Sequence, residues 1–228
     1  MHLDARLRAA AELVPQGSRV ADIGTDHAYL AAALLEEGRA SQVVACDKNA
    51  GPCEAARRTV LEHGLEAKAS VRQGDGLAPL QEQEADVVCI AGMGGQLIIE
   101  ILAASPHITA GLRRLVLQPM NAAQELRRWL YANGWHIADE RLARTDGRVY
   151  EILAAEPGKQ AMPESVLLSI GPVLWQKKPE LLREHIGLLL ARERRAAAGM
   201  EKSESARKGE KYAEHMAAIK ELEAKLTW

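Results

Sequence analysis

Residues 20–30 read VADIGTDHAYL, a stretch that passes from β-type to helical composition over a single glycine. The β-type run covers residues 19–23, turns at Gly24 and enters an Ala/Leu-rich helical run from about His27 to Glu37. Unpaired N–H groups at the start of a helix attract anions, and a glycine lets a ligand approach the main chain closely. The stretch predicts a strand, a tight loop and a helix that form half of a nucleotide-type cofactor site.

The loop lacks a dinucleotide fingerprint, because Asp26 and Tyr29 stand where the second and third glycines would be needed. A carboxylate in the loop repels a pyrophosphate but suits a ligand with hydroxyls, an ammonium and a sulfonium. S-adenosylmethionine has all of these groups. The alternative is an ordinary helix start, since Thr25 and Asp26 are both common capping residues. The loop alone leaves both interpretations open.

Composition indicates a soluble globular protein, and a cytoplasmic location fits it best. The 228 residues are 47% hydrophobic and 26% charged, enough for one sizeable core and a small accessory domain. The first residues lack the apolar core of a signal peptide, and no apolar run approaches membrane-spanning length, so we expect no membrane partner. Cys46, Cys53 and Cys89 form no CxxC pair, and we expect neither a bound metal nor a disulfide framework.

The order of elements predicts the fold class. A helix over residues 2–14 precedes five β-type runs, which cover residues 19–23, 42–46, 69–72, 85–91 and 113–118. Two more β-type runs, 135–143 and 149–155, are joined by the turn sequence Thr145-Asp146-Gly147 and predict a hairpin. We therefore expect an α/β, Rossmann-like sheet of seven strands with helices on both faces and one reversed edge strand. This layout is the common one for S-adenosylmethionine-dependent methyltransferases.

Three further loops follow strands and are expected at the same edge of the sheet. Asp47 ends the second strand, about twenty residues after the glycine loop, where a carboxylate commonly binds ribose hydroxyls; its alternative is a helix cap. Asp75, flanked by glycines, is placed to accept from an adenine amino group, although a plain turn explains it nearly as well. Residues 92–95 read GMGG, which indicates either a substrate-facing loop, the interpretation we favour, or close packing of a helix.

In combination these motifs resemble the bacterial tRNA adenine-22 N1-methyltransferase family. The likeness covers residues 6–155, and the helical C-terminal extension of that family extends it to nearly the whole chain. The motifs that carry it are residues 21–30, Gly74-Asp75-Gly76, residues 91–95, Leu117-Gln118-Pro119, Trp129-Leu130-Tyr131 with Asn133-Gly134-Trp135, and Tyr150-Glu151-Ile152.

The resemblance implies a class I S-adenosylmethionine-dependent enzyme that methylates adenine N1 in tRNA to 1-methyladenosine. The cofactor pocket it implies, with adjacent loop residues, consists of Asp22, Gly24, Asp26, His27, Tyr29, Leu30, Asp47, Lys48, Asp75, Gly76, Gly92 and Met93. On the substrate side we expect Gly94, Gly95, Gln118, Arg127, Arg128, Arg194 and Arg195.

For catalysis, Asp26 is the first choice for the group that stabilises the cationic methylated base or accepts its proton, and His27 is the second. A role for both in cofactor binding alone is at least as well supported. Two other functions stay open without the resemblance: a methyltransferase that acts on DNA, another RNA or a small molecule, and a nucleotide-binding protein with a helical partner-binding module.

The sequence predicts a catalytic domain over residues 1–158 and a helical domain over residues 159–228. Two helical stretches, about 180–199 and 205–226, predict an antiparallel hairpin and a short coiled coil. The seam positions expected from steps of three and four are Leu182, His185, Leu189, Arg192 and Ala196, then Tyr212, Met216, Ile219, Glu223 and Leu226.

The helical domain is the more basic part of the chain, because residues 157–228 hold 13 Lys/Arg against 10 Asp/Glu. Seven cations are expected at the hairpin tip, where they would suit tRNA phosphates: Arg192, Arg194, Arg195, Lys202, Arg207, Lys208 and Lys211. An oligomerisation hairpin is about equally supported; we favour a monomer, although the sequence leaves the oligomeric state undecided. In the catalytic domain, Asn121 is expected to cap a helix that reaches Ala132 and exposes Arg127 and Arg128.

Overall fold

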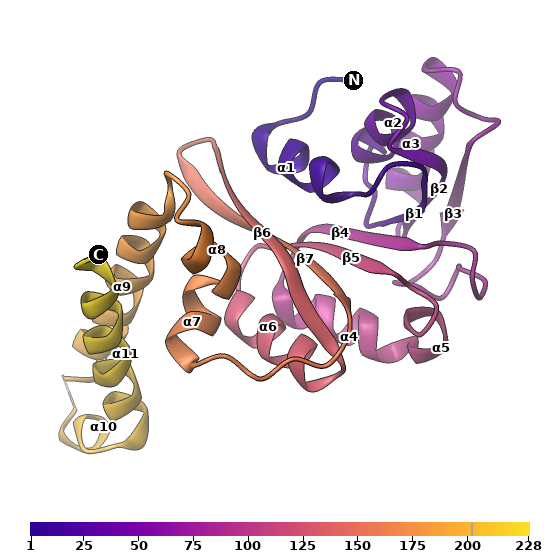
Figure 1. Ribbon diagram of the computed structural model, residues 1–228. Helices are drawn as coiled ribbons and strands as arrows, with labels where there is room; N and C mark the ends of the chain where they lie inside the picture. The colour runs from indigo at the N-terminus through magenta and orange to yellow at the C-terminus, as the bar shows by residue number, and fades with distance from the viewer. Residues whose placement is uncertain (202) are drawn as a thin grey trace. The chain divides into compact units, whose positions relative to one another are not determined.

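Seven strands form one mixed sheet in the computed structural model, which describes residues 1–201 and 203–228 (Figure 1). The strands are β1 Ser18–Ile23, β2 Ala40–Asp47, β3 Ala69–Gln73, β4 Val87–Met93, β5 Arg114–Pro119, β6 Trp135–Thr145 and β7 Arg148–Pro157. Their order across the sheet is β3-β2-β1-β4-β5-β7-β6. The predicted seven-strand α/β fold is therefore confirmed.

The reversed strand is not at the edge of the sheet, where the sequence placed it. β7 runs antiparallel to both β5 and β6 and lies between them, while β1 to β5 pair in parallel. Asp146 and Gly147 have φ values of 50° and 73°, the left-handed backbone of a tight hairpin turn. This turn holds β7 beside β6. The connection from β5 therefore places β6 one strand position away from β5, and β7 occupies the position between them.

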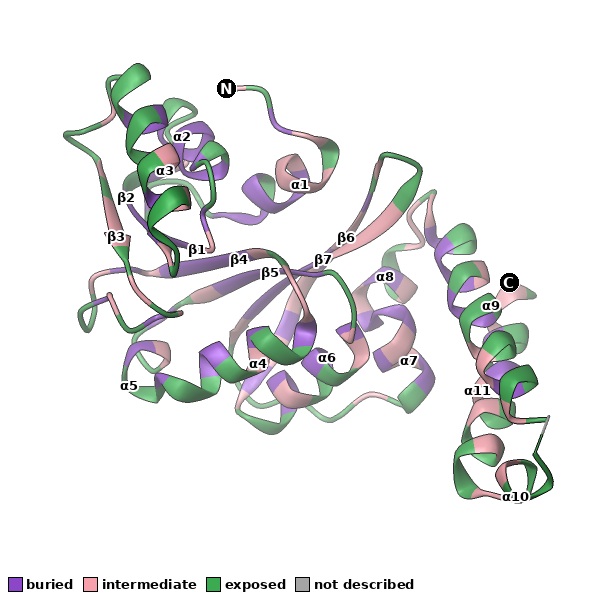
Figure 2. Ribbon diagram, turned by 180° about the vertical axis from the view of Figure 1, so that it is seen from behind, coloured by how far each residue is buried: buried purple, intermediate pink, exposed green. Residues whose placement is uncertain are grey.

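Helices cover both faces of the sheet, as predicted (Figure 1). One face carries α1 Ala5–Leu13, α2 Tyr29–Glu36 and α3 Ala50–Glu62, and the other carries α4 Gly95–Ala104, α5 Pro106–Thr109 and α6 Ala123–Ala132. The central strands lie between these layers and are mostly buried (Figure 2). In β4, residues 87–90 are at most 1% exposed, which explains why this strand is a continuous apolar run. None of the described helices is both long and apolar enough to cross a membrane.

Two helix starts differ from the sequence prediction. α2 begins after Ala28 and α6 after Ala122, and both flanking alanines have left-handed backbones, with φ values of 57° and 51°. Neither helix start has a side-chain cap. The predicted cap by Asn121 is therefore wrong, and capping does not explain Thr25 and Asp26, since the chain makes an extra bend before α2 begins.

The chain divides into two compact units, residues 1–162 and 163–228. The second unit contains α7 Ser165–Ile170, α8 Pro172–Lys177, α9 Leu182–Met200, α10 Glu204–Arg207 and α11 Glu210–Leu226. α9 and α11 pack along each other. The start of α9 lies beside the end of α11, where Arg183 donates to the carbonyl of Leu226 at 3.1 Å. The two long helices therefore form the antiparallel hairpin that the sequence predicts.

The seam of this hairpin differs in part from the prediction. Leu182, His185 and Leu189 are buried as expected, and His185 Nε2 lies 3.1 Å from the carbonyl of Ile170. Ile219 is also buried as expected. Arg192, Met216 and Glu223 are exposed instead, and neighbouring residues take their places in the seam: Glu193, Ala197, His215 and Leu222. Glu193 is tolerated in the seam because its carboxylate lies 2.6 Å from His215 Nδ1, whereas Arg192 keeps its charge in water.

Candidate cofactor and substrate site

The loop after β1 is held against the end of β2. The N–H groups of Gly24 and Thr25 both donate to the carbonyl of Cys46, at 2.8 and 3.0 Å. Gly24 has a φ of 71°, and a Cβ added there would overlap the terminal methyl of Met93. A glycine is therefore required at this position for two reasons, the left-handed backbone and the close approach of the Met93 side chain.

Asp22 and Leu30 lie beneath this loop and are each 4% exposed. The Thr25 hydroxyl donates to Asp22 Oδ2 at 2.7 Å. Burial raises the pKa of Asp22 to about 6, although the hydrogen bond from Thr25 opposes the shift. Since both side chains are enclosed, we expect them to set the shape of the loop from below.

Asp47 connects the first two loops of the site. Its Oδ2 accepts from the N–H of Asp26 at 3.4 Å, and its Oδ1 accepts from the N–H of Asn49 at 2.9 Å. The Asp47 carboxylate therefore binds backbone N–H groups of both loops. It does not cap α3, which begins after Asn49 without a side-chain cap. A carboxylate has about four lone-pair sites, so Asp47 keeps acceptor capacity for a ligand.

Asp26, His27 and Tyr29 face outward at the same loop. The side chain of Asp26 is 71% exposed, that of His27 50%, and the residue Tyr29 45%. The rings of His27 and Tyr29 stack at a centroid distance of 5.3 Å and an interplanar angle of 16°. The loop therefore presents one carboxylate beside two stacked aromatic rings.

The loop after β3 carries a surface ion pair. Lys48 Nζ donates to Asp75 Oδ2 at 2.8 Å, and both side chains are more than two-thirds exposed. Exposed pairs contribute between zero and about 1 kcal/mol to stability, so either group can exchange its partner for a ligand. The neighbouring Gly76 has a φ of 55°, and a Cβ there would meet Ile101 at 3.0 Å.

The loop after β4 is fixed by side chains from distant parts of the chain. The N–H of Gly92 and Nη1 of Arg6 both donate to Gln118 Oε1, at 3.0 and 2.7 Å. The Arg6 guanidinium also lies over the ring of Tyr150, 5.8 Å from its centroid. Sequence reasoning missed Arg6, because nothing in the helix that contains it distinguishes it from an ordinary surface arginine.

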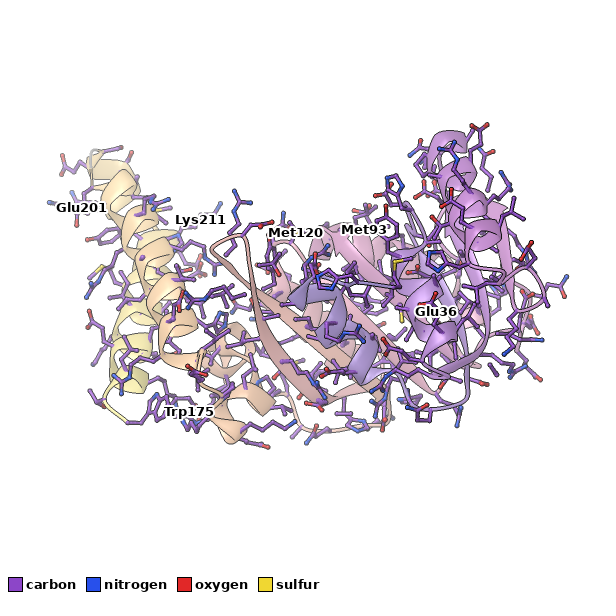
Figure 3. All side chains as sticks on the ribbon, turned by 90° about the horizontal axis from the view of Figure 1, so that it is seen from above. Glu36, Met93, Met120, Trp175, Glu201 and Lys211 are labelled. Atoms are coloured by element: carbon purple, nitrogen blue, oxygen red, sulfur yellow. The ribbon has the colours of Figure 1, made fainter. Side chains whose placement is uncertain are left out.

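Met93 and Met120 lie next to each other at this part of the site (Figure 3), where the N–H of Met120 donates to the carbonyl of Met93 at 2.7 Å. The side chain of Gln118 is fully enclosed and donates to the carbonyl of Pro119 at 3.0 Å. The predicted substrate residue Gln118 therefore supports the loop from inside, and the loop backbone from Gly92 to Gly94 forms the accessible part.

Gly95 serves the packing of α4 against α6. It is buried, its N–H donates to the carbonyl of Asn121 at 3.1 Å, and a Cβ there would lie 2.5 Å from the carbonyl oxygen of Ala122. For Gly95 the structure supports the packing explanation that we placed second. Gly94 remains accessible, with the side-chain oxygen of Asn121 at 3.1 Å from its Cβ position.

Comparison with known proteins identifies the family of this chain. The methyltransferase domain family matches residues 3–153. The tRNA (adenine(22)-N(1))-methyltransferase of Bacillus subtilis (strain 168) is 42% identical over 183 residues, which cover 78% of this chain and 77% of the relative. The chain belongs to this tRNA methyltransferase family.

Two crystal structures extend the likeness to the whole chain. The B. subtilis M1A22 tRNA methyltransferase TrmK has a TM-score of 0.89 at 34% identity, with 99% of both chains covered. Streptococcus pneumoniae Sp1610, in complex with S-adenosyl-L-methionine, has a TM-score of 0.88 at 31% identity, covering 99% of this chain and 100% of that protein. The family resemblance drawn from the sequence motifs is confirmed.

In this member of the methyltransferase family, the predicted exposure of Arg127 is wrong. Arg127 is fully buried and donates to Glu140 Oε1 at 2.6 Å and to Glu151 Oε2 at 2.5 Å. Burial alone would lower the pKa of the guanidinium, but the two carboxylates outweigh it and raise the pKa. Arg128 is exposed as predicted, so only it remains a candidate for substrate contact on α6.

The remaining groups that the sequence singled out belong to the second unit or are buried. Arg194 and Arg195 belong to the second unit, where Arg194 pairs with Glu223 at 2.6 Å. The three cysteines are free and buried, and burial raises the pKa of the Cys46 thiol to about 12. Residues 1–201 and 203–228 contain no cluster of three His, Cys, Asp or Glu side chains that could hold a metal ion.

Proposed function

We propose that this chain transfers a methyl group from S-adenosyl-L-methionine to N1 of adenine 22 in tRNA. The observation that carries the proposal is the 42% identity to the B. subtilis tRNA (adenine(22)-N(1))-methyltransferase over more than three-quarters of both chains. The loops after β1, β2, β3 and β4 support it, because such loops bind ligands at the carboxyl edge of an open α/β sheet. A tRNA substrate also favours a cytoplasmic location.

The side chains at this edge fit the chemistry of the cofactor. Asp47 has acceptor capacity for two ribose hydroxyls, and Asp75 can accept from an adenine amino group when it leaves Lys48. Asp26 offers an exposed negative charge to an ammonium or sulfonium group. S-adenosyl-L-methionine supplies an electrophilic methyl group when bound.

Catalysis in this proposal depends mainly on positioning. Adenine N1 is a neutral nucleophile with an in-plane lone pair, so the protein must align it with the methyl–sulfonium bond and exclude water. The backbone of residues 92–94, which Gln118 and Arg6 hold in place, forms a fixed surface against which the flat base can pack. Because N1 lies on the Watson–Crick edge, a paired adenine must leave its helix before it can react.

After transfer the purine is cationic. The Asp26 carboxylate is placed on an exposed loop, where it can stabilise that charge or accept a proton from the exocyclic amine. His27 lies beside it, with Nε2 3.7 Å from Asp26 Oδ1, and is the second candidate for the proton. This assignment follows from the chemistry of the two groups and their exposure.

The decisive assay uses labelled S-adenosyl-L-methionine and two unmodified tRNAs, one with adenine at position 22 and one with guanine there. We expect labelled 1-methyladenosine by mass spectrometry of nucleosides from the first tRNA only. Asp26→Asn keeps the left-handed backbone, at φ 50°, that asparagine tolerates. We expect this variant to lose about 10²-fold in turnover at saturating cofactor.

The matched control is Asp146→Asn, which changes the same group at the hairpin turn, also at φ 50°. It should retain wild-type turnover. Absence of 1-methyladenosine from the adenine-22 tRNA would refute the proposed function. Turnover within twofold of wild type in Asp26→Asn would instead remove Asp26 from the catalytic step and leave the function intact.

A further inference from the structure

Two tryptophan rings and three cationic side chains meet where α9 begins and α11 ends. The rings of Trp175 and Trp228 contact each other edge to face, with centroids 5.8 Å apart. Lys178 Nζ lies over the Trp175 ring and 4.2 Å from the Trp228 centroid. Lys225 Nζ is 4.8 Å from the Trp175 centroid, and the Arg183 guanidinium is 5.5 Å from that of Trp228. We call these five residues the Trp–Lys cluster.

Two of the three cations in the Trp–Lys cluster, Lys178 and Lys225, have no carboxylate partner among the described residues. Lys178 Nζ is buried and has no hydrogen-bond partner, and burial together with the charge of Lys225 lowers its pKa. In the described part of the chain, neither Lys178 nor Lys225 forms an ion pair with a carboxylate. Arg183 donates to the carbonyl of Leu226 at 3.1 Å and to the main-chain oxygen of Trp228, the last residue of the sequence, at 2.8 Å. Lys178 and Lys225 would therefore attract an anion to this surface.

The hairpin tip, which the sequence favoured for RNA phosphates, is different. Arg194 pairs with Glu223, Lys208 with Glu204 and Arg192 with Glu193, at 2.6, 2.6 and 3.1 Å. Lys202, another predicted member of the tip, lies outside the described residues. Carboxylates thus already pair with three of the cations expected to contact phosphates.

We propose that the Trp–Lys cluster, rather than the hairpin tip, is the RNA contact of the second unit and binds a backbone phosphate beside a stacked base. Proteins bind flexible nucleic-acid strands by combining cations along the backbone with aromatic faces for the bases. Lys225 supplies the charge that contacts the phosphate, the enclosed Lys178 adds positive charge behind it, and Trp228, which is 43% exposed, supplies an accessible ring. The inference rests on the proposed function, since it takes tRNA as the substrate.

The test compares Lys225→Gln with Lys220→Gln, the same charge change at an exposed position on the same helix. Binding of fluorescent tRNA to the full chain is measured by anisotropy from 50 to 300 mM salt. Loss of one phosphate contact should lower the salt slope by about one and weaken binding roughly fivefold at low salt. Lys220→Gln should bind within twofold of wild type.

A third variant, Trp228→Ala, separates stacking from charge. Loss of one stacked base should weaken tRNA binding roughly tenfold at every salt concentration without a change in slope. Thermal unfolding of each variant, with cofactor affinity measured by calorimetry, shows whether the fold is retained. Lys225→Gln is the primary variant, because its side chain can be shortened without opening the packing between the two tryptophans.

The outcomes separate this inference from the proposed function. If Lys225→Gln keeps the tRNA affinity and salt slope of the wild type, or if Lys220→Gln loses as much, the Trp–Lys cluster is not the RNA contact. In that case its role is to fasten the ends of α8, α9 and α11. A wild-type chain that binds no tRNA would overturn the proposed function together with this inference.

Discussion

Arg127 shows how a single side chain can be misassigned from its chemical type. On α6, residues 123, 126, 130 and 131 are buried, and this spacing places position 127 inside the same stripe. The arginine is tolerated there because Glu140 from β6 and Glu151 from β7 both reach it. Arg127 therefore stabilises the packing of α6 against the β6–β7 hairpin.

We predict that Arg127→Met lowers the free energy of unfolding by about 3–5 kcal/mol, because it removes the guanidinium that pairs with two carboxylates in an enclosed site. Arg128→Met is the matched control on the exposed side of the helix and should change stability by less than about 0.5 kcal/mol. Urea denaturation measures both. Equal denaturation midpoints for the two variants would contradict the structural role of Arg127. Loss of methyl transfer by Arg127→Met without loss of stability would instead support the predicted role of Arg127 in substrate binding.

At the scale of elements, the loop after β4 is shaped by how closely α4 approaches the start of α6. Gly95 begins α4 with no room for a Cβ, because the backbone oxygen of Ala122 lies 2.5 Å from that position. A backbone atom cannot move away as the end of a flexible side chain can. The accessible residues 92–94 thus depend on a glycine that itself faces the protein interior.

We predict that Gly95→Ala destabilises the protein by about 1–3 kcal/mol through overpacking, and that it weakens binding of S-adenosyl-L-methionine. Gly187→Ala supplies the control inside α9, where nothing lies within 4 Å of the Cβ position. There the substitution should stabilise the helix by roughly 0.5–1 kcal/mol. Calorimetric unfolding and cofactor titration distinguish the two, and a neutral Gly95→Ala would show that the helices can separate at no cost.

At the scale of the whole molecule, the methyl-transfer site and the Trp–Lys cluster belong to different compact units. The loops proposed to hold the cofactor all lie within residues 1–162, and the cluster lies within residues 163–228. Each unit has its own buried residues, among them Ile90 and Leu117 in the first and Leu182 and Ile186 in the second. Cofactor binding and RNA binding should therefore be separable.

We predict that deletion of residues 163–228 leaves a folded chain whose affinity for S-adenosyl-L-methionine stays within threefold of wild type. Its affinity for tRNA should fall by at least tenfold, because the charge and stacking contributions of the second unit are lost. Calorimetry and anisotropy measure the two affinities. Unchanged tRNA binding would indicate another role for the α9–α11 hairpin, such as self-association. Loss of cofactor binding would show that the first unit needs the second.

The sequence by itself determined the order of strands and helices, the hairpin turn at Asp146 and Gly147, and the family. These depend on local periodicity, on turn residues and on motifs read along the chain. Only the tertiary structure decided that β7 lies inside the sheet, that Arg127 is buried and that Arg6 reaches Gln118. It also placed Lys178 and Lys225 beside the rings of Trp175 and Trp228. The contacts of Arg127 and Arg6 join residues 13 or more positions apart, and periodicity along the sequence carries no information about such partners.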